Sequence, residues 1–129
     1  MDIVLSPIGV IRSPYHNKEE TPKWGTDEAE TEAEIILDSK YLEGIADMRP
    51  GEKYQILFFF HASDGFQLTV AKRGTGPKTG VFSTHSPNRP NGIGVSVITV
   101  TAIDGNHIRF TGVDMLDNTP LLDIKSYNI

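Results

Sequence analysis

The alternation of apolar and polar residues along the chain predicts short β-strands separated by turns. β-Branched residues favour a first strand over Ile3–Ile11, and Ala33–Leu37 has the pattern of a second. Lys53–His61 is the strongest strand, and it is apolar on both faces towards its end, which is typical of a central position. The turn signal Asp64-Gly65 predicts that Gln67–Ala71 returns beside it as a hairpin.

The second half of the chain continues this pattern. Gly80–Thr84 is expected to form a strand stub. Val95–Ala102 and His107–Val113 then form a hairpin around Asp104-Gly105-Asn106, and Leu121–Lys125 is the last strand.

One segment has helical spacing instead. Apolar residues at positions 41, 45 and 48 predict a short helix over Lys40–Met48, which ends at Pro50-Gly51. Many short strands with one short helix predict a mainly β fold, and a closed or nearly closed barrel would hide the strand edges. The 129 residues are enough for one domain, which we expect to span residues 1–129.

Composition excludes several classes of site. The chain has no cysteine, which removes disulfides, thiolate nucleophiles and cysteine-ligated zinc, and its four histidines are scattered. No metal site is therefore expected. There is no apolar run of membrane-spanning length and no leader pattern, so we expect no membrane association and a cytoplasmic protein.

The charges are unevenly distributed. The net charge is −5, and acidic residues gather between positions 17 and 38. Residues 65–103 contain no acid, and they carry the cations Lys72, Arg73, Lys78 and Arg89 together with His85. In the simpler interpretation, these are two solvated faces of opposite charge. In the functional interpretation, residues 65–103 form a local basic surface that binds phosphates.

The segment Gly80–Ser96 is rich in proline, glycine and hydrogen-bonding side chains, and it offers little to a core. One interpretation is a tight turn system that closes a barrel end, with Arg89 bridging loop carbonyls. The other is a preorganised ligand loop, in which Arg89 binds an anion and Asn91 binds a polar edge.

A second segment, Gly112–Tyr127, places three aspartates within a mostly apolar stretch. One or two of them suit a turn, since Asp117-Asn118-Thr119 is a turn sequence. Asp123 lies between Leu122 and Ile124, where a carboxylate needs a partner or a role.

Together these two segments resemble the TsaA/YaeB-like family, which includes the TrmO enzymes. The first reads Gly-Val-Phe-Ser-Thr-His-Ser-Pro-Asn-Arg-Pro-Asn-Gly-Ile-Gly-Val-Ser without a gap against the family motif. The second reads Gly-Val-Asp-Met-Leu-Asp-Asn-Thr-Pro-Leu-Leu-Asp-Ile-Lys-Ser-Tyr. The resemblance implies a β-barrel that binds S-adenosyl-L-methionine, commonly as a homodimer with the cofactor near the interface. It also implies N6-methylation of threonylcarbamoyladenosine at tRNA position 37.

By motif position, the resemblance assigns the cofactor contacts. They fall at Pro22, Lys23, Trp24, His61, Ala62, His85, Val95, Leu116, Asp117, Asn118 and Thr119, to which the loop adds Arg89 and Asn91. The family has arginine at position 85, proline at 92 and glycine at 118, and asparagine also accepts positive φ.

The acceptor nitrogen of that substrate is a weak nucleophile, so a base would help. Asp117 and Asp123 are the candidates. A methyltransferase acting on a small molecule and a non-catalytic S-adenosylmethionine-binding module remain as alternatives.

Overall fold

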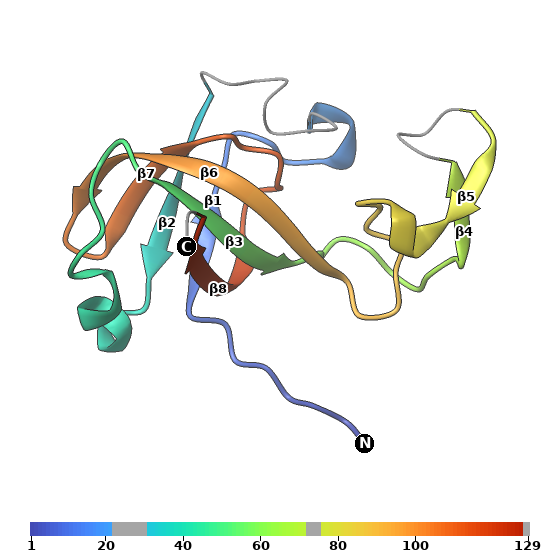
Figure 1. The fold of residues 1–129 in the computed structure, drawn as a ribbon, viewed down its shortest axis with the longest axis horizontal. Helices are drawn as coiled ribbons and strands as arrows, with labels where there is room; N and C mark the ends of the chain where they lie inside the picture. Colours follow the sequence, from blue (N-terminus) through green and yellow to red (C-terminus); the bar gives the residue numbers. More distant parts are fainter. Residues whose placement is uncertain (22–30, 72–75, 128–129) are drawn as a thin grey trace.

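Six antiparallel strands close into a ring in the order β1-β2-β7-β6-β3-β8 (Figure 1). This computed structural model describes residues 1–21, 31–71 and 76–127. The ring consists of β1 (Gly9–Arg12), β2 (Glu32–Leu37), β3 (Lys53–Phe59), β6 (Ile93–Asp104), β7 (His107–Thr111) and β8 (Thr119–Ser126). The mainly β, barrel-like fold expected from the sequence is confirmed.

The core lies inside this ring. Along β6, alternate residues from Gly94 to Val100 are buried, and the residues between them face outwards. The side chains that are almost completely buried come from all parts of the ring: Ile11, Ile35, Ile56, Ile98, Val100, Ile108, Phe110 and Leu121. Strand alternation thus supplies one apolar interior. No helix in the described residues is long and apolar enough to cross a membrane.

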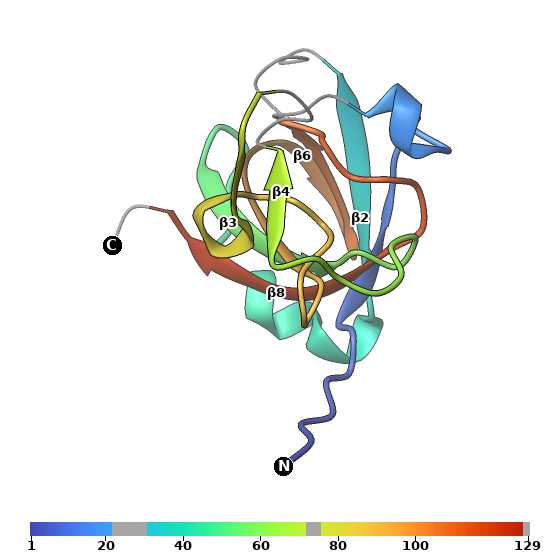
Figure 2. The same ribbon diagram turned by 90° about the vertical axis from the view of Figure 1, so that its right-hand side faces the viewer.

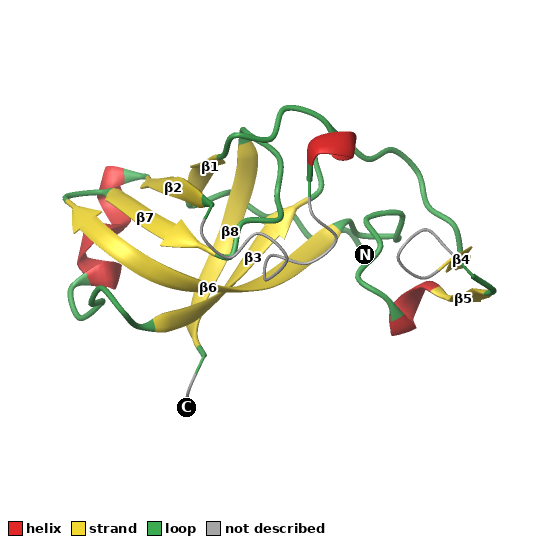
Figure 3. Ribbon diagram, turned by 90° about the horizontal axis from the view of Figure 1, so that it is seen from above, coloured by secondary structure: helices red, strands yellow, loops and turns green. Residues whose placement is uncertain are grey.

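A second, two-stranded sheet projects from one end of the ring. It contains β4 (Thr69–Ala71) and β5 (Lys78–Gly80), and the short 3-10 helix η5 (Val81–Ser83) follows it. Figures 1 and 3 show it well separated from the strands of the barrel, and Figure 2 looks at the ring from the end that carries it, with β4 in front. The strand expected over Gly80–Thr84 is therefore wrong, because β5 ends at Gly80 and the chain turns into η5.

Two other sequence expectations are wrong. The first strand begins at Gly9 and not at Ile3, since residues 1–7 are exposed and pair with no described strand. Gln67–Ala71 does not return along β3, because β3 already has β6 on one side and β8 on the other. β4 pairs instead with β5. A central strand has no free edge to offer a hairpin partner.

The expected helix and the expected hairpin of the second half are both present. The expected helix is the 3-10 helix η3 (Ser39–Ile45), capped by the Asp38 carboxylate, which accepts from the Lys40 N–H at 3.2 Å. A shorter 3-10 segment, η1, covers Lys18–Glu20. β6 and β7 form the predicted hairpin, in which Gly105 has φ 60° at the turn.

Candidate functional site

Arg89 organises the motif loop from within. Its Nη2 donates to the carbonyls of Val81 at 2.7 Å and Thr84 at 3.0 Å, and its Nη1 also donates to Thr84 O at 3.1 Å. The Thr84 hydroxyl donates to Val81 O at 2.8 Å and accepts from the Ser86 N–H at 3.1 Å. The guanidinium is half-buried and adds a donor to Val81 O, which also accepts from Thr84, and two donors to Thr84 O. Arg89 thus bridges loop carbonyls, whatever else it binds.

This loop is also held against the end of β3. The Phe60 N–H donates to Gly92 O at 2.8 Å, and the Gln67 N–H donates to Asn88 O at 3.1 Å. His61 and Ala62 directly follow this anchor and are exposed. The structure therefore brings one group of predicted residues to the same end of the ring: His61, Ala62, His85, Arg89 and Asn91.

Two glycines, Gly92 and Gly94, allow the motif loop and the start of β6 to lie close to the end of β3. A Cβ on Gly94 would lie 2.5 Å from the Phe58 ring and 2.8 Å from the Phe60 ring. The two rings pack edge to face, with their centroids 5.3 Å apart. Gly92 has φ 59°, which a proline cannot adopt, so this chain has its own loop conformation where the family motif has proline.

Asp117 is the centre of a second cluster. Its carboxylate accepts from Arg12 Nε at 2.8 Å and from the Ser13 N–H at 3.0 Å, while its own N–H donates to Tyr15 O at 2.7 Å. The His16 Nδ1 lies 3.9 Å from its Oδ2. The hydrogen bond from Arg12, followed by that from the Ser13 N–H, lowers the pKa of Asp117 below its usual value.

The turn that carries Asp117 has the conformation its sequence predicts. Asn118 has φ 66°, and among the described residues it alone has positive φ without being glycine. The Thr119 hydroxyl donates to Leu116 O at 2.6 Å, and Thr119 is buried. Leu116, Asp117, Asn118 and Thr119 thus form one compact turn beside the Arg12–Tyr15 segment.

A contact between Ser96 and Asp114 joins the two motif segments, and no sequence pattern predicts it. Ser96 Oγ lies 2.8 Å from both carboxylate oxygens of Asp114. Ser96 faces inwards on β6 and is buried, so this hydrogen bond stabilises a polar group inside the fold. The only sequence feature that points to this hydrogen bond is a serine at an inward-facing position of an alternating strand.

Asp123 lies apart from Asp117. It occupies the second half of β8, where its carboxylate accepts from the Ile124 N–H at 2.9 Å and pairs with Lys125 Nζ at 3.1 Å. Asp117 lies in the turn before β8, and the four-residue step along the strand from Thr119 to Asp123 spans about 13 Å at about 3.3 Å per residue. The structure does not bring the two candidate bases into one centre.

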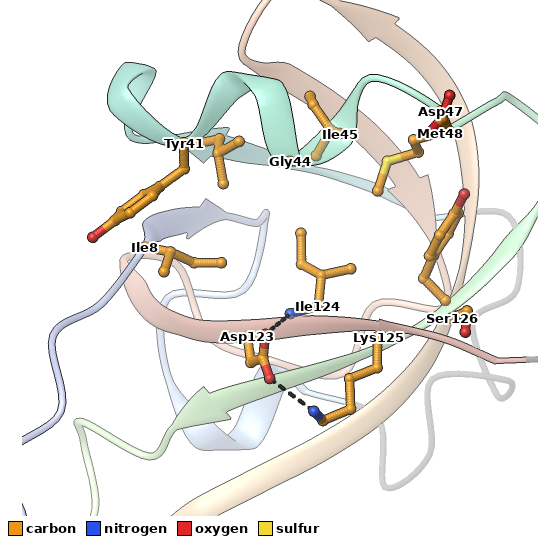
Figure 4. A pocket seen from close by; sticks show the side chains of 12 residues that line it. Ile8, Tyr41, Gly44, Ile45, Asp47, Met48, Asp123, Ile124, Lys125 and Ser126 are labelled. Atoms are coloured by element: carbon orange, nitrogen blue, oxygen red, sulfur yellow. Dashed lines mark hydrogen bonds and ion pairs between the residues drawn. The ribbon is translucent and has the colours of Figure 1, made fainter.

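Asp123 instead borders a cavity of about 360 Å³ between η3 and β8 (Figure 4). Most of the lining is apolar, and it includes Ile45, Met48 and Ile124. None of the other predicted site residues lines this cavity.

Some predicted residues lie outside the described chain, namely Pro22, Lys23 and Trp24 of the cofactor set and Lys72 and Arg73 of the basic stretch. Val95 lies on the outer face of β6, in a row with Ile93 and Val97, and each of these three is 38–40% exposed. Phe59, opposite Ile93 on β3, extends the row. Across residues 1–21, 31–71 and 76–127, no cluster of three or more histidines or carboxylates could hold a metal ion.

Comparison with known proteins gives a consistent result. The family described as the tRNA-methyltransferase O N-terminal domain matches residues 10–129. A probable S-adenosyl-L-methionine-binding protein of Methanothermobacter thermautotrophicus is 35% identical over 98% of this chain and 91% of its own length. The mouse tRNA (adenine(37)-N6)-methyltransferase is 35% identical over 98% of this chain.

Solved structures agree with the sequence comparison. The crystal structure of TrmO from Pseudomonas aeruginosa superposes with a TM-score of 0.81 at 30% identity, covering 98% of this chain. The chain spans 56% of that TrmO and 31% of the mouse enzyme. On this match of sequence and fold, the chain belongs to the tRNA-methyltransferase O N-terminal domain family.

Proposed function

We propose that this protein is an S-adenosylmethionine-dependent methyltransferase that N6-methylates threonylcarbamoyladenosine at tRNA position 37. The observation that carries the proposal is the family match over residues 10–129. It is supported by relatives named for S-adenosylmethionine binding and for tRNA (adenine(37)-N6)-methyltransferase activity. A tRNA substrate also accords with a cytoplasmic location.

S-Adenosylmethionine supplies an activated methyl group, so the protein's work is mainly to bind and orient. The loop fixed by Arg89 presents His85 and Asn91, and the turn at residues 116–119 presents backbone groups in a set geometry. Such preorganisation lowers the entropy lost when the reactants are aligned. The residues we assign to the cofactor are those given by the motifs, including Pro22, Lys23 and Trp24.

The two aspartates have different environments. Asp117 is held by Arg12 and Ser13, and its lowered pKa suits a group that positions neighbouring atoms better than one that accepts a proton. Asp123 is half-exposed beside Lys125. We retain both aspartates as candidates for the catalytic step, and we assign to Asp117 the role of positioning neighbouring atoms.

A homodimer is part of the proposal. The apolar row Phe59, Ile93, Val95 and Val97 lies on the outside of the barrel, where a monomer would leave it in water. Phe66, Leu68 and Phe82 are 56–76% exposed on and beside the projecting sheet. These surfaces suit a partner subunit, and Val95 in the row would place the cofactor near the interface.

The test is a transfer assay with labelled S-adenosylmethionine and total tRNA from cells that lack this modification. We expect label in tRNA, in a nucleoside whose mass matches the N6-methylated product. The names of the archaeal relatives favour a second candidate, a non-catalytic S-adenosylmethionine-binding module. Tight cofactor binding without transfer to tRNA or to a metabolite extract would select that module, and transfer to the extract alone would indicate a small-molecule methyltransferase.

A further inference from the structure

β8 continues beyond the point where β1 ends. β1 pairs with β8 from Ile11↔Thr119 to Gly9↔Leu121, and the Ile8 N–H donates to Leu121 O at 2.8 Å. From there to Ser126, β8 pairs with β3 on one side, and no strand of the described chain pairs with its other side. This half of β8 is therefore an open edge that an added strand can extend.

The cavity of about 360 Å³ lies beside this edge (Figure 4). Residues 123–126 of β8 form one wall, and η3 forms the opposite one with Tyr41 and Ile45. Ile8 and Ile124 add apolar surface between them. Backbone edge next to an apolar hollow is the combination that binds an extended apolar segment, since the main chain supplies hydrogen bonds and the hollow receives side chains.

The chain itself contains such a segment. We call residues 1–7 the arm. It leads away from the ring in Figures 1 and 2, and all seven residues are exposed. The exposed fractions of Ile3, Val4 and Leu5 are 75%, 91% and 57%. No hydrogen bond or ion pair joins the arm to the rest of the described chain. Three consecutive apolar residues in water favour a role in contact with another surface.

An antiparallel arm can align with the open edge. In the register of the β1–β8 pairs, Leu5 lies opposite Lys125 and Val4 lies opposite Ser126. In its own chain the arm leaves that register at Ile8, whose N–H donates to Leu121 O one residue out of step with Gly9↔Leu121, and Pro7 has no N–H to extend the ladder. Each copy therefore offers both an unpaired segment and an unpaired edge. In a dimer with a twofold axis, the arm of each copy can pair with the β8 edge of the other.

We propose that the arm of one copy adds as an antiparallel strand to the β8 edge of a second copy, with Val4 opposite Ser126. Ser126 shares its face of β8 with Ile124, whose side chain points into the cavity in Figure 4, and opposed residues share a face, so Val4 lies on the side of the apolar hollow. The exchange rests on the self-association that is part of the proposed function, but it uses different residues from the apolar row on β6. The two can therefore fail separately.

Disulfide trapping tests this arrangement directly, because the chain has no cysteine of its own. Val4→Cys and Ser126→Cys are made as single variants, one with a longer affinity tag, then mixed, allowed to exchange subunits and mildly oxidised. Opposed residues in an antiparallel pair have the Cα separation that a disulfide needs. We expect a mixed-size dimer on a non-reducing gel that dithiothreitol dissolves. The matched control is Val4→Cys with Lys78→Cys on β5, which should trap several-fold less.

Three results would overturn the exchange. The double variant Val4→Cys/Ser126→Cys could form only an internal disulfide, which would place the arm on its own edge. Trapping could be no greater than in the control, or the control could trap better, which would place the arm on the projecting sheet. Light scattering separates the two proposals: a dimer without trapping overturns the exchange alone, whereas a monomer overturns both the exchange and the proposed homodimer.

Discussion

Asp117 shows how one side chain joins distant parts of the chain. Its partner Arg12 is 105 residues away, and the contact fixes the turn before β8 against the end of β1. The same hydrogen bonds lower the pKa of the carboxylate, so ionised Asp117 favours the folded state. This residue is therefore a point where stability depends on pH.

Asp117→Asn should reduce the acid sensitivity of the fold. A carboxylate whose folded pKa lies below its unfolded value, near 3.9, stabilises above that value. The stabilisation is lost as pH falls through the folded pKa. We expect the variant to be less stable than the native protein at pH 7, and the gap to narrow below about pH 4. Urea unfolding at several pH values measures this; Asp104→Asn, an exposed turn variant, should keep the native profile. A gap independent of pH would contradict the assignment.

Tyr15 offers a contrasting case. Its hydroxyl is buried and has no hydrogen-bond partner in the described structure, although the ring packs against the core. Tyr15→Phe should therefore leave stability unchanged or raise it, by about 1 kcal/mol, since it removes an unsatisfied buried group. Denaturant unfolding is the measurement. Tyr54→Phe is the matched control and should not stabilise, because the Tyr54 hydroxyl donates to Glu52 at 2.7 Å. A clear loss of stability in Tyr15→Phe would show that the hydroxyl is used.

At the scale of elements, the loop between η5 and β6 depends on one arginine. Arg89→Ala should lower affinity for S-adenosylmethionine by roughly tenfold, or about 1.4 kcal/mol, because three loop hydrogen bonds are lost and the loop no longer has one shape. Calorimetry measures the binding. The structure provides a control in Arg49, which likewise bridges two carbonyls, those of Ala46 and Met48, but outside the candidate site. If Arg49→Ala lowers the affinity as much as Arg89→Ala does, the loss reflects a general decrease in protein stability and not the order of the motif loop.

For the whole molecule, the central question is which surfaces meet another copy. Val97→Lys places a charge in the outward apolar row without touching the residues assigned to the cofactor. We expect the dimer to weaken, so that the mass measured by light scattering falls towards that of a monomer at a higher protein concentration than for the native protein, since burying an unpaired ammonium opposes association. Ala102→Lys, an exposed position further along β6, should dissociate as the native protein does. A native protein that is already monomeric, or a Val97→Lys variant that dissociates no more readily than the native protein, would remove this row from the interface.

The local features of the fold follow from short-range sequence patterns. Period-two alternation predicts β6 and β7, the Asp-Gly-Asn turn joins them, and Asn118 accepts the left-handed conformation that its turn requires. These follow from backbone sterics and side-chain direction, which act over a few residues. Prolines and glycines likewise mark the loop Gly80–Ser96 as irregular, whereas the hydrogen bonds from Arg89 to loop carbonyls are only one of the two roles that the sequence allows for this residue.

The remaining features depend on contacts between residues that are distant in the sequence. Which strands flank β3, and hence where β4 pairs, depends on long-range competition for a central strand's two edges. The Arg12–Asp117 and Ser96–Asp114 contacts, and the separation of Asp117 from Asp123, arise only when the ring closes. Ile3–Leu5 has a strand pattern yet no partner within its own chain. A pattern specifies how a segment can pair, whereas the free energy of a pairing depends on which edges and surfaces the folded molecule leaves available.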